Sequence, residues 1–250
     1  MLSVTYRGSS AIWRQAWRQP PCAPARHPPT LVCVTDRPTI PHPSEVPVSR
    51  VETTEDTVTV DGREIVLVRP REMNDLLTEE AFERENLMPY WAQLWAGAPV
   101  LADVVAASVE PGTTVLELGC GLGLPSVAAA RAGARVTATD WSPSALAAVA
   151  ANARRNGVEL ETVVADWEYP DDLVSHGPWD LVIASDIVYE KAQIDTLLAL
   201  LPRLGPAVLL SEPRRAVAEP FFARADEIWS RTVVAASTEP KVAVHRLVTR

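Results

Sequence analysis

From about residue 113 to the end of the chain, the pattern of apolar residues alternates between one typical of strands and one typical of helices. Short runs rich in β-branched and other apolar residues predict buried strands at 113–116, 135–139, 162–164, 180–184 and 207–211. Ala- and Leu-rich runs with helical spacing predict helices at 126–132, 142–156, 194–201 and 220–229, the third of them ended by Pro202. Regular alternation of strand and helix predicts an α/β fold with a parallel sheet that helices cover on both faces.

Segments on either side of this alternation predict antiparallel pairing. Residues 57–68 predict a β-hairpin, because Asp61-Gly62 is a favoured two-residue turn between two β-rich arms. The last apolar runs, 232–236 and 242–248, predict two strands that pair antiparallel at one edge of the main sheet. Two helices are expected between the hairpin and the first parallel strand, at 72–85 and 99–107.

A glycine-rich turn, 117–123, connects the first parallel strand to the helix that follows it. Its sequence, Glu-Leu-Gly-Cys-Gly-Leu-Gly, lets the backbone approach a ligand closely, and the next helix N-terminus offers unpaired N–H groups to an anion. A dinucleotide fingerprint would need a glycine at position 124, which is leucine. Asp140 ends the next strand about 20 residues after Gly119, the spacing at which a carboxylate meets a ribose diol. Trp141 follows at once and is placed to cover an adenine ring.

The glycine-rich turn and Asp140 together resemble motif I and the ribose-binding carboxylate of the class I S-adenosylmethionine (SAM) methyltransferases. The resemblance implies a Rossmann-like, seven-strand class I methyltransferase sheet and SAM as the cofactor. It also implies that Asp166 meets the adenine amino group and that Trp167 packs on the ring. Taken alone, these two residues are more simply a loop Asp and a half-buried Trp.

A second acidic position follows the strand at 180–184, where ligands of open α/β sheets gather. There Asp186 begins the sequence Asp-Ile-Val-Tyr, which ends at Tyr189. Methyl transfer needs an acceptor amine held in line with the methyl group, and a lysine amine, with a reference pKa of about 10.4, must first lose its proton. A carboxylate beside a tyrosine hydroxyl can hold and aim such an amine. The alternative is structural, with Asp186 capping a helix near Lys191 and Tyr189 merely packed.

Residues 186–189 resemble the Asp-x-x-Tyr/Phe element of the seven-strand protein-lysine methyltransferases, and residues 89–97 resemble the Trp-rich segment that precedes their SAM core. That group includes the electron-transfer-flavoprotein lysine methyltransferases and the bacterial proteins called nicotinamide N-methyltransferase-like. The resemblance covers about residues 88–215. It implies that Trp95 lies against the methionine part of SAM and that Trp91 lies nearer the acceptor, with core packing as the alternative for both rings.

Two further segments bear on the acceptor. Gln93 departs from the acidic or aromatic residue typical of the Trp-rich segment, so the acceptor stays open. Residues 212–215 either rim the acceptor pocket or start a helix. The resemblance thus makes Asp186 and Tyr189 the expected catalytic residues. The expected cofactor-binding residues are Trp95, Glu117, Gly119, Gly121, Gly123, Asp140, Trp141, Asp166 and Trp167.

Composition divides the chain of 250 residues into two parts. Residues 1–45 are rich in proline and are expected to be a disordered extension, with an organelle-targeting peptide as the alternative. Five arginines against two acidic residues give this part a net charge of +3. Because the whole chain has a net charge of −9, residues 46–250 carry a net charge of −12. An acidic domain repels phosphate backbones and favours a basic partner.

The expected function is therefore that of a SAM-dependent N-methyltransferase domain, residues 46–250, acting on a lysine side chain of a protein. The alternatives are a small-molecule N-methyltransferase on the same fold and a non-catalytic SAM-binding module that regulates a partner. No nucleic acid is expected to take part, because the domain is acidic. No membrane or metal is expected either, because no run of 18 apolar residues occurs and the cysteines and histidines lack metal-ligand spacing. A cytoplasmic location and a monomer are favoured.

Overall fold

The computed structural model describes residues 51–76 and 88–250 of the chain. The extension expected at 1–45 lies outside the described residues, as does most of the helix expected at 72–85. Within the described part of that helix, Met73–Leu76 forms a short 3-10 turn, η3. A second 3-10 turn, η4, covers Tyr90–Ala92.

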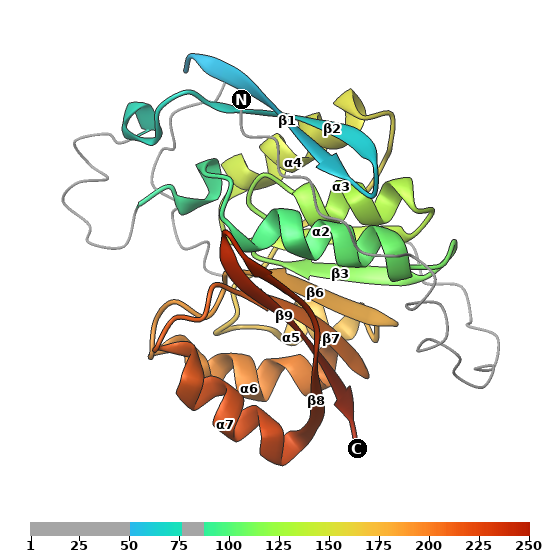
Figure 1. Ribbon diagram of the computed structural model, residues 1–250, viewed down its shortest axis with the longest axis vertical. Coiled ribbons are helices and arrows are strands. Elements are labelled where there is room, and N and C mark those ends of the chain that lie inside the picture. The colour runs from blue at the N-terminus through green and yellow to red at the C-terminus, as the bar shows by residue number, and fades with distance from the viewer. Residues whose placement is uncertain (1–50, 77–87) are drawn as a thin grey trace.

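Seven strands form the main sheet in the order β5-β4-β3-β6-β7-β9-β8 (Figure 1). Neighbouring strands from β5 to β7 pair in parallel, whereas β9 is antiparallel to both β7 and β8. The parallel sheet with an antiparallel pair at one edge confirms the predicted fold class. The strands are β3 Thr114–Leu118, β4 Arg135–Asp140, β5 Glu161–Val164, β6 Leu181–Ser185, β7 Ala207–Glu212, β8 Trp229–Thr238 and β9 Lys241–Thr249.

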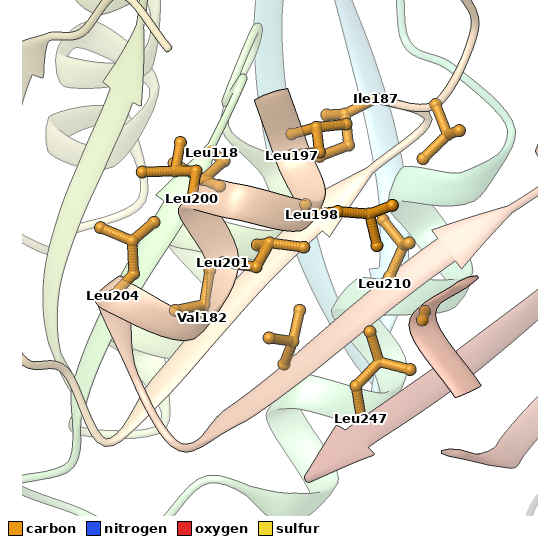
Figure 2. Packing of buried hydrophobic residues seen from close by; sticks show 14 of the residues in the cluster. Leu118, Val182, Ile187, Leu197, Leu198, Leu200, Leu201, Leu204, Leu210 and Leu247 are labelled. Carbon is orange, nitrogen blue, oxygen red and sulfur yellow. The ribbon is translucent and has the colours of Figure 1, made fainter. Parts of the chain in front are cut away.

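Helices cover both faces of this sheet (Figure 1). On one face α2 and α3 contribute Leu101, Val105 and Ala129 to an apolar cluster with the central strands. On the other face, α6 and α7 pack against the same strands through leucine and phenylalanine side chains, and Figure 2 shows the α6 part of this core. The helices are α2 Gly97–Ser108, α3 Leu124–Arg131, α4 Pro143–Arg155, α5 Asp171–Ser175, α6 Gln193–Leu204 and α7 Ala218–Ile228.

The predicted hairpin is present as a separate two-stranded sheet of β1, Thr53–Val60, and β2, Arg63–Pro70. Its turn residues have φ values of 46° at Asp61 and 73° at Gly62, the left-handed pair that a type I′ turn requires. The hairpin lies over α3 and α4, on the side of those helices that faces away from the main sheet (Figure 1). Ile65 and Leu67 of β2 are buried there against residues of α3 and α4.

Two helix ends differ from the prediction. Helix α6 continues through Pro202 to Leu204. Proline in a helix interior costs about 3 kcal/mol, and burial of a leucine side chain contributes about 1.5–3 kcal/mol, so the buried Leu200, Leu201 and Leu204 offset the missing hydrogen bond. Trp229, expected to end α7, instead begins β8 and is fully buried in the core. The described residues include no helix that is both long and apolar enough to cross a membrane.

Candidate functional site

The glycine-rich turn connects β3 to α3 and has all three glycines in the left-handed region, with φ values of 63° at Gly119, 50° at Gly121 and 77° at Gly123. A Cβ on Gly123 would lie 2.0 Å from Cγ2 of Val149 in α4, and one on Gly121 would lie 3.2 Å from the carbonyl oxygen of Trp91. Backbone conformation and close packing therefore both require glycine at 123.

Glu117 lies in β3 and is fully buried. Its Oε2 accepts hydrogen bonds from the backbone N–H of Ser126, at 3.0 Å, and from the Ser126 hydroxyl, in the first turn of α3. Oε1 is buried and has no hydrogen-bond partner among the described residues. Burial raises the pKa of Glu117 to about 8, against the effect of the Ser126 hydrogen bonds, because removal from water disfavours the charged form.

Asp140 ends β4 and is 5% exposed. Its Oδ2 accepts the N–H of Gly121 at 3.0 Å and its Oδ1 accepts the N–H of Ser142 at 3.0 Å. Ser142 caps α4, since its hydroxyl oxygen accepts the N–H of Ala145. One carboxylate therefore fixes the glycine-rich turn against the start of α4. A carboxylate offers about four acceptor positions, so these bonds are compatible with additional hydroxyl donors.

Three residues expected near an adenine ring lie in the loops after β4 and β5. Trp141 is 43% exposed, and Asp166 is exposed with its Oδ1 accepting the N–H of Glu168 at 2.9 Å. Trp167 is half-buried and packs against the core; its ring would lie 3.5 Å from a Cβ on Gly119. Trp167 is thus directly beside the glycine-rich turn, whereas the Asp166 carboxylate bonds within its own loop.

Asp186 follows β6 in a left-handed conformation, φ 58°, and is 6% exposed. Its Oδ2 accepts the N–H of Gly97 in the first turn of α2 at 2.8 Å, and its Oδ1 accepts a guanidinium N–H of Arg215 at 3.1 Å. Burial raises the pKa of Asp186, while Arg215 and the Gly97 hydrogen bond oppose that rise. The side chain does cap a helix, but that helix is α2 and not the one near Lys191.

Arg215 connects Asp186 to a second buried carboxylate, Glu212, at the end of β7. The backbone N–H of Arg215 donates to both oxygens of Glu212 at 3.0 Å, and one guanidinium nitrogen lies 3.8 Å from Glu212 Oε1. Residues 212–215 therefore form a connection between β7 and Asp186, ahead of α7, which begins only at Ala218. The sequence placed this segment either at the pocket rim or in a helix, and it gave no signal for the pairing with Asp186.

Tyr189 lies beside two aromatic residues of the Trp-rich segment. Its ring centroid is 6.0 Å from that of Tyr90, which in turn is 6.0 Å from that of Trp95, both in edge-to-face geometry. The Trp95 indole N–H donates to the Tyr90 carbonyl at 2.8 Å, and Gln193 lies 3.4 Å from the Tyr189 hydroxyl. Tyr189 and Tyr90 are 40% and 44% exposed. Tyr90, which the sequence reasoning did not single out, belongs to the same aromatic group.

The remaining residues of the Trp-rich segment have separate environments. Trp91 is 8% exposed and packs among apolar residues that include Leu122 of the glycine-rich turn, the core position that was the alternative for this ring. Gln93 is exposed. The carboxyl ends of β3, β4 and β6 thus bring Glu117, Asp140 and Asp186 to one edge of the sheet. The Trp-rich segment contacts this edge through Trp91, beside Gly121, and through Gly97, which bonds to Asp186.

Comparison with known proteins finds that the chain is similar to named methyltransferases. The chain is 34% identical over 135 residues to the electron transfer flavoprotein beta subunit lysine methyltransferase of Danio rerio, covering 51% of each chain. It is 32% identical over 116 residues to the histone-arginine methyltransferase METTL23 of Mus musculus, covering 44% of this chain and 46% of the relative. The chain thus spans about half the length of the curated relatives it matches.

A solved structure and a family profile complete the comparison. The 16S rRNA methyltransferase RsmC of T. thermophilus superimposes with a TM-score of 0.58 at 13% identity, covering 79% of this chain and 51% of that one, which shows the shared fold. The lysine methyltransferase profile matches residues 90–227, more than half of the chain, and this range includes the glycine-rich turn, Asp140 and Asp186. The chain belongs to the lysine methyltransferase family.

Proposed function

We propose that this protein is a SAM-dependent methyltransferase that methylates the side-chain amine of a lysine in a protein substrate. The observation that carries the proposal is the convergence of three buried carboxyl groups, Glu117, Asp140 and Asp186, on the carboxyl edge of one sheet beside a glycine-rich turn. Membership of the lysine methyltransferase family supports the choice of reaction, and the names of the flavoprotein-modifying relatives support a protein acceptor.

The residues of the turn fit a SAM molecule. Gly121 and Gly123 let the turn pack closely against Trp91 and Val149, and Asp140 supplies a buried carboxylate next to the turn that suits a ribose diol. Oε1 of Glu117, buried without a partner among the residues described, suits the amino group of the methionine part. When bound, SAM supplies an electrophilic methyl group on a sulfonium centre. Trp167, which lies beside Gly119, and the more exposed Trp141 suit contact with the adenine ring.

The acceptor side of the proposed site is formed by Asp186 and the aromatic group of Tyr90, Trp95 and Tyr189. Aromatic rings attract an ammonium ion through their faces, by about 0.5–1 kcal/mol where exposed, so the half-exposed Tyr90 and Tyr189 suit the approach of a protonated amine. Asp186, held at fixed geometry by Gly97 and Arg215, then orients the amine after its proton has left to solvent. Positioning of the acceptor is thus the main contribution of these residues.

A transfer assay with a lysine-blocked control tests this function. The protein would be incubated with methyl-labelled SAM and a cell lysate depleted of small molecules, either untreated or with its lysines already blocked by acetylation. We expect label in protein from the untreated lysate, recovered as methyl-lysine after hydrolysis, and its loss in the blocked lysate.

Each other outcome identifies a different function. Equal labelling of the blocked lysate would assign the methyl group to another residue type, such as arginine, the target named for one of the relatives. Label found only in the small-molecule fraction would indicate a small-molecule acceptor. SAM binding without any transfer would leave a SAM-binding module.

A further inference from the structure

Asn152 lies on α4, is fully buried, and uses both ends of its carboxamide. Its Oδ1 accepts the backbone N–H of Val68 in β2 at 2.8 Å, and its Nδ2 donates to the backbone carbonyl of Leu122 in the glycine-rich turn at 3.0 Å. A single side chain therefore joins the hairpin to the turn through α4. These two segments are far apart in the sequence, and α4 contacts both of them through this residue.

The bond to Leu122 fixes one particular peptide group of the turn. The N–H of the same peptide, that of Gly123, donates to the Cys120 carbonyl at 2.7 Å. Because the carbonyl and N–H of a trans peptide point in opposite directions in one plane, bonds at both ends fix the orientation of that plane. Val149, one helical turn before Asn152, packs where a Cβ of Gly123 would be. Helix α4 thus determines the path of the turn at two successive residues.

Asn156, one helical turn after Asn152, bonds to the same hairpin but makes no bond to the glycine-rich turn among those of its side chain. Its Oδ1 accepts the N–H of Val66 at 3.0 Å, and its Nδ2 donates to the carbonyls of Val66 and Asn152, both at 2.8 Å. All three bonds end within β2 or α4. Two asparagines therefore anchor β2 on α4, and one of them also reaches the glycine-rich turn, so Asn156 serves as a matched control for Asn152.

We propose that Asn152 is a positioning residue for the cofactor turn and that it couples docking of the β1–β2 hairpin to SAM binding. This proposal rests on the SAM site proposed above. If the docked hairpin holds Asn152 in place and Asn152 holds the turn in its binding conformation, hairpin docking strengthens SAM binding. Coupling between two sites is reciprocal, so bound SAM must in turn stabilise the docked hairpin.

Calorimetric titration of SAM into two variants separates this coupling from simple anchoring. Asn152→Asp, measured at pH 8, keeps an acceptor for Val68 but sets an oxygen against the Leu122 carbonyl. Asn156→Ala removes the bonds to Val66 and to the Asn152 carbonyl but leaves both bonds of the Asn152 side chain in place. Loss of a buried hydrogen-bond partner commonly changes an equilibrium tenfold or more. We expect Asn152→Asp to weaken SAM binding about tenfold or more. In Asn156→Ala the hairpin stays docked through Asn152 and the buried Ile65 and Leu67, so we expect a lower thermal midpoint but a change in SAM affinity of less than about twofold.

Hydrogen exchange in the parent protein supplies a measurement that needs no variant. Addition of SAM should slow exchange of the Val68 amide more than that of amides in the β8–β9 hairpin, which lies at the far edge of the main sheet. Equal slowing in both hairpins would reflect global stabilisation alone and would overturn the coupling. SAM affinity of Asn152→Asp equal to that of the parent, or an equal loss in both variants, would also overturn it. Absence of SAM binding by the parent would instead refute the proposed function, and the coupling with it.

Discussion

The carboxylate of Asp186 and the backbone N–H of Gly97 are joined by a buried hydrogen bond of 2.8 Å, which ties the end of β6 to the first turn of α2. A Cβ on Gly97 would lie 2.3 Å from the same carboxylate oxygen and 2.6 Å from the Ser211 hydroxyl oxygen. The position of the proposed acceptor-orienting carboxylate thus depends on the absence of a side chain at residue 97.

Gly97→Ala should displace Asp186. The new methyl group and the oxygen cannot both occupy the site, and a buried polar group that loses its partner costs about 1–3 kcal/mol. We expect urea denaturation to show a loss of stability larger than that caused by Gly157→Ala. Gly157 has a φ of 71° but open space around its Cβ position, so it measures backbone strain without crowding. Unchanged stability of Gly97→Ala would show that residue 97 tolerates a methyl group.

Asp186→Asn should separate methyl transfer from cofactor binding. The amide oxygen can still accept the Gly97 N–H, but the charge that pairs with Arg215 is removed. Misplacement of a reacting group can lower a rate by about 100-fold, so transfer to a verified acceptor should fall by that order while SAM affinity stays within a few-fold. Tyr189→Phe, which removes only a hydroxyl, should have a milder effect. Full turnover of Asp186→Asn would leave this residue as a cap of α2.

Asp140→Ala should weaken SAM binding at least tenfold. Hydrogen bonds to a charged carboxylate contribute about 1.5–3 kcal/mol each, and this variant also releases the Gly121 N–H from its partner. Ser142→Ala is the matched control, because it removes the cap of α4 but keeps the carboxylate. Calorimetry on variants verified as folded should show a much smaller loss of affinity for Ser142→Ala. Unchanged affinity in Asp140→Ala would remove this carboxylate from the cofactor site.

SAM binding at pH 7 should release a proton from Glu117. With a pKa of about 8 this carboxyl is mostly protonated at pH 7, and a cationic amino group placed at Oε1 would lower its pKa and drive the proton off. The heat of binding should therefore differ between phosphate and Tris buffers, whose ionisation enthalpies differ. Glu117→Gln should abolish that difference. A buffer-independent heat in the parent protein would argue against the amino group contacting Glu117.

His245 should destabilise the fold in acid. Burial, aided by Arg231 and Arg214, lowers its pKa from the ordinary 6.5 to about 4, and its ring lies 4.1 Å from that of Phe222. The folded state thus binds fewer protons than the unfolded state between these values, so the free energy of unfolding falls as the pH drops from about 6.5 to 4. His245→Phe should flatten this part of the pH dependence in thermal melts. A profile identical to that of the parent would assign the acid sensitivity to other groups.

Positions that depend on local pattern and chain order were predictable from the sequence. Strand β4 and its terminal Asp140 follow from a β-branched run and from the rule that ligands gather at carboxyl ends of strands. The partner of Asp186 was not predictable, because Arg215 lies in the loop after another strand, β7, and follows a left-handed residue, Arg214, with φ 60°. Pro202 was misleading because tertiary burial outweighed the local proline effect. The proposed roles of the site residues remain predictions for the experiments above.

The position of β9 has a consequence for the order in which the fold assembles. This strand follows the other six strands of the sheet along the described chain, yet it lies inside the sheet, between β7 and β8. In the described part of the chain β8 pairs only with β9, so β8 leaves the ribosome before the strand that attaches it to the sheet exists. The parallel strands can form their ladder earlier during synthesis, with the edge of β7 exposed until β9 arrives. Completion of the sheet is therefore a late, long-range step of folding.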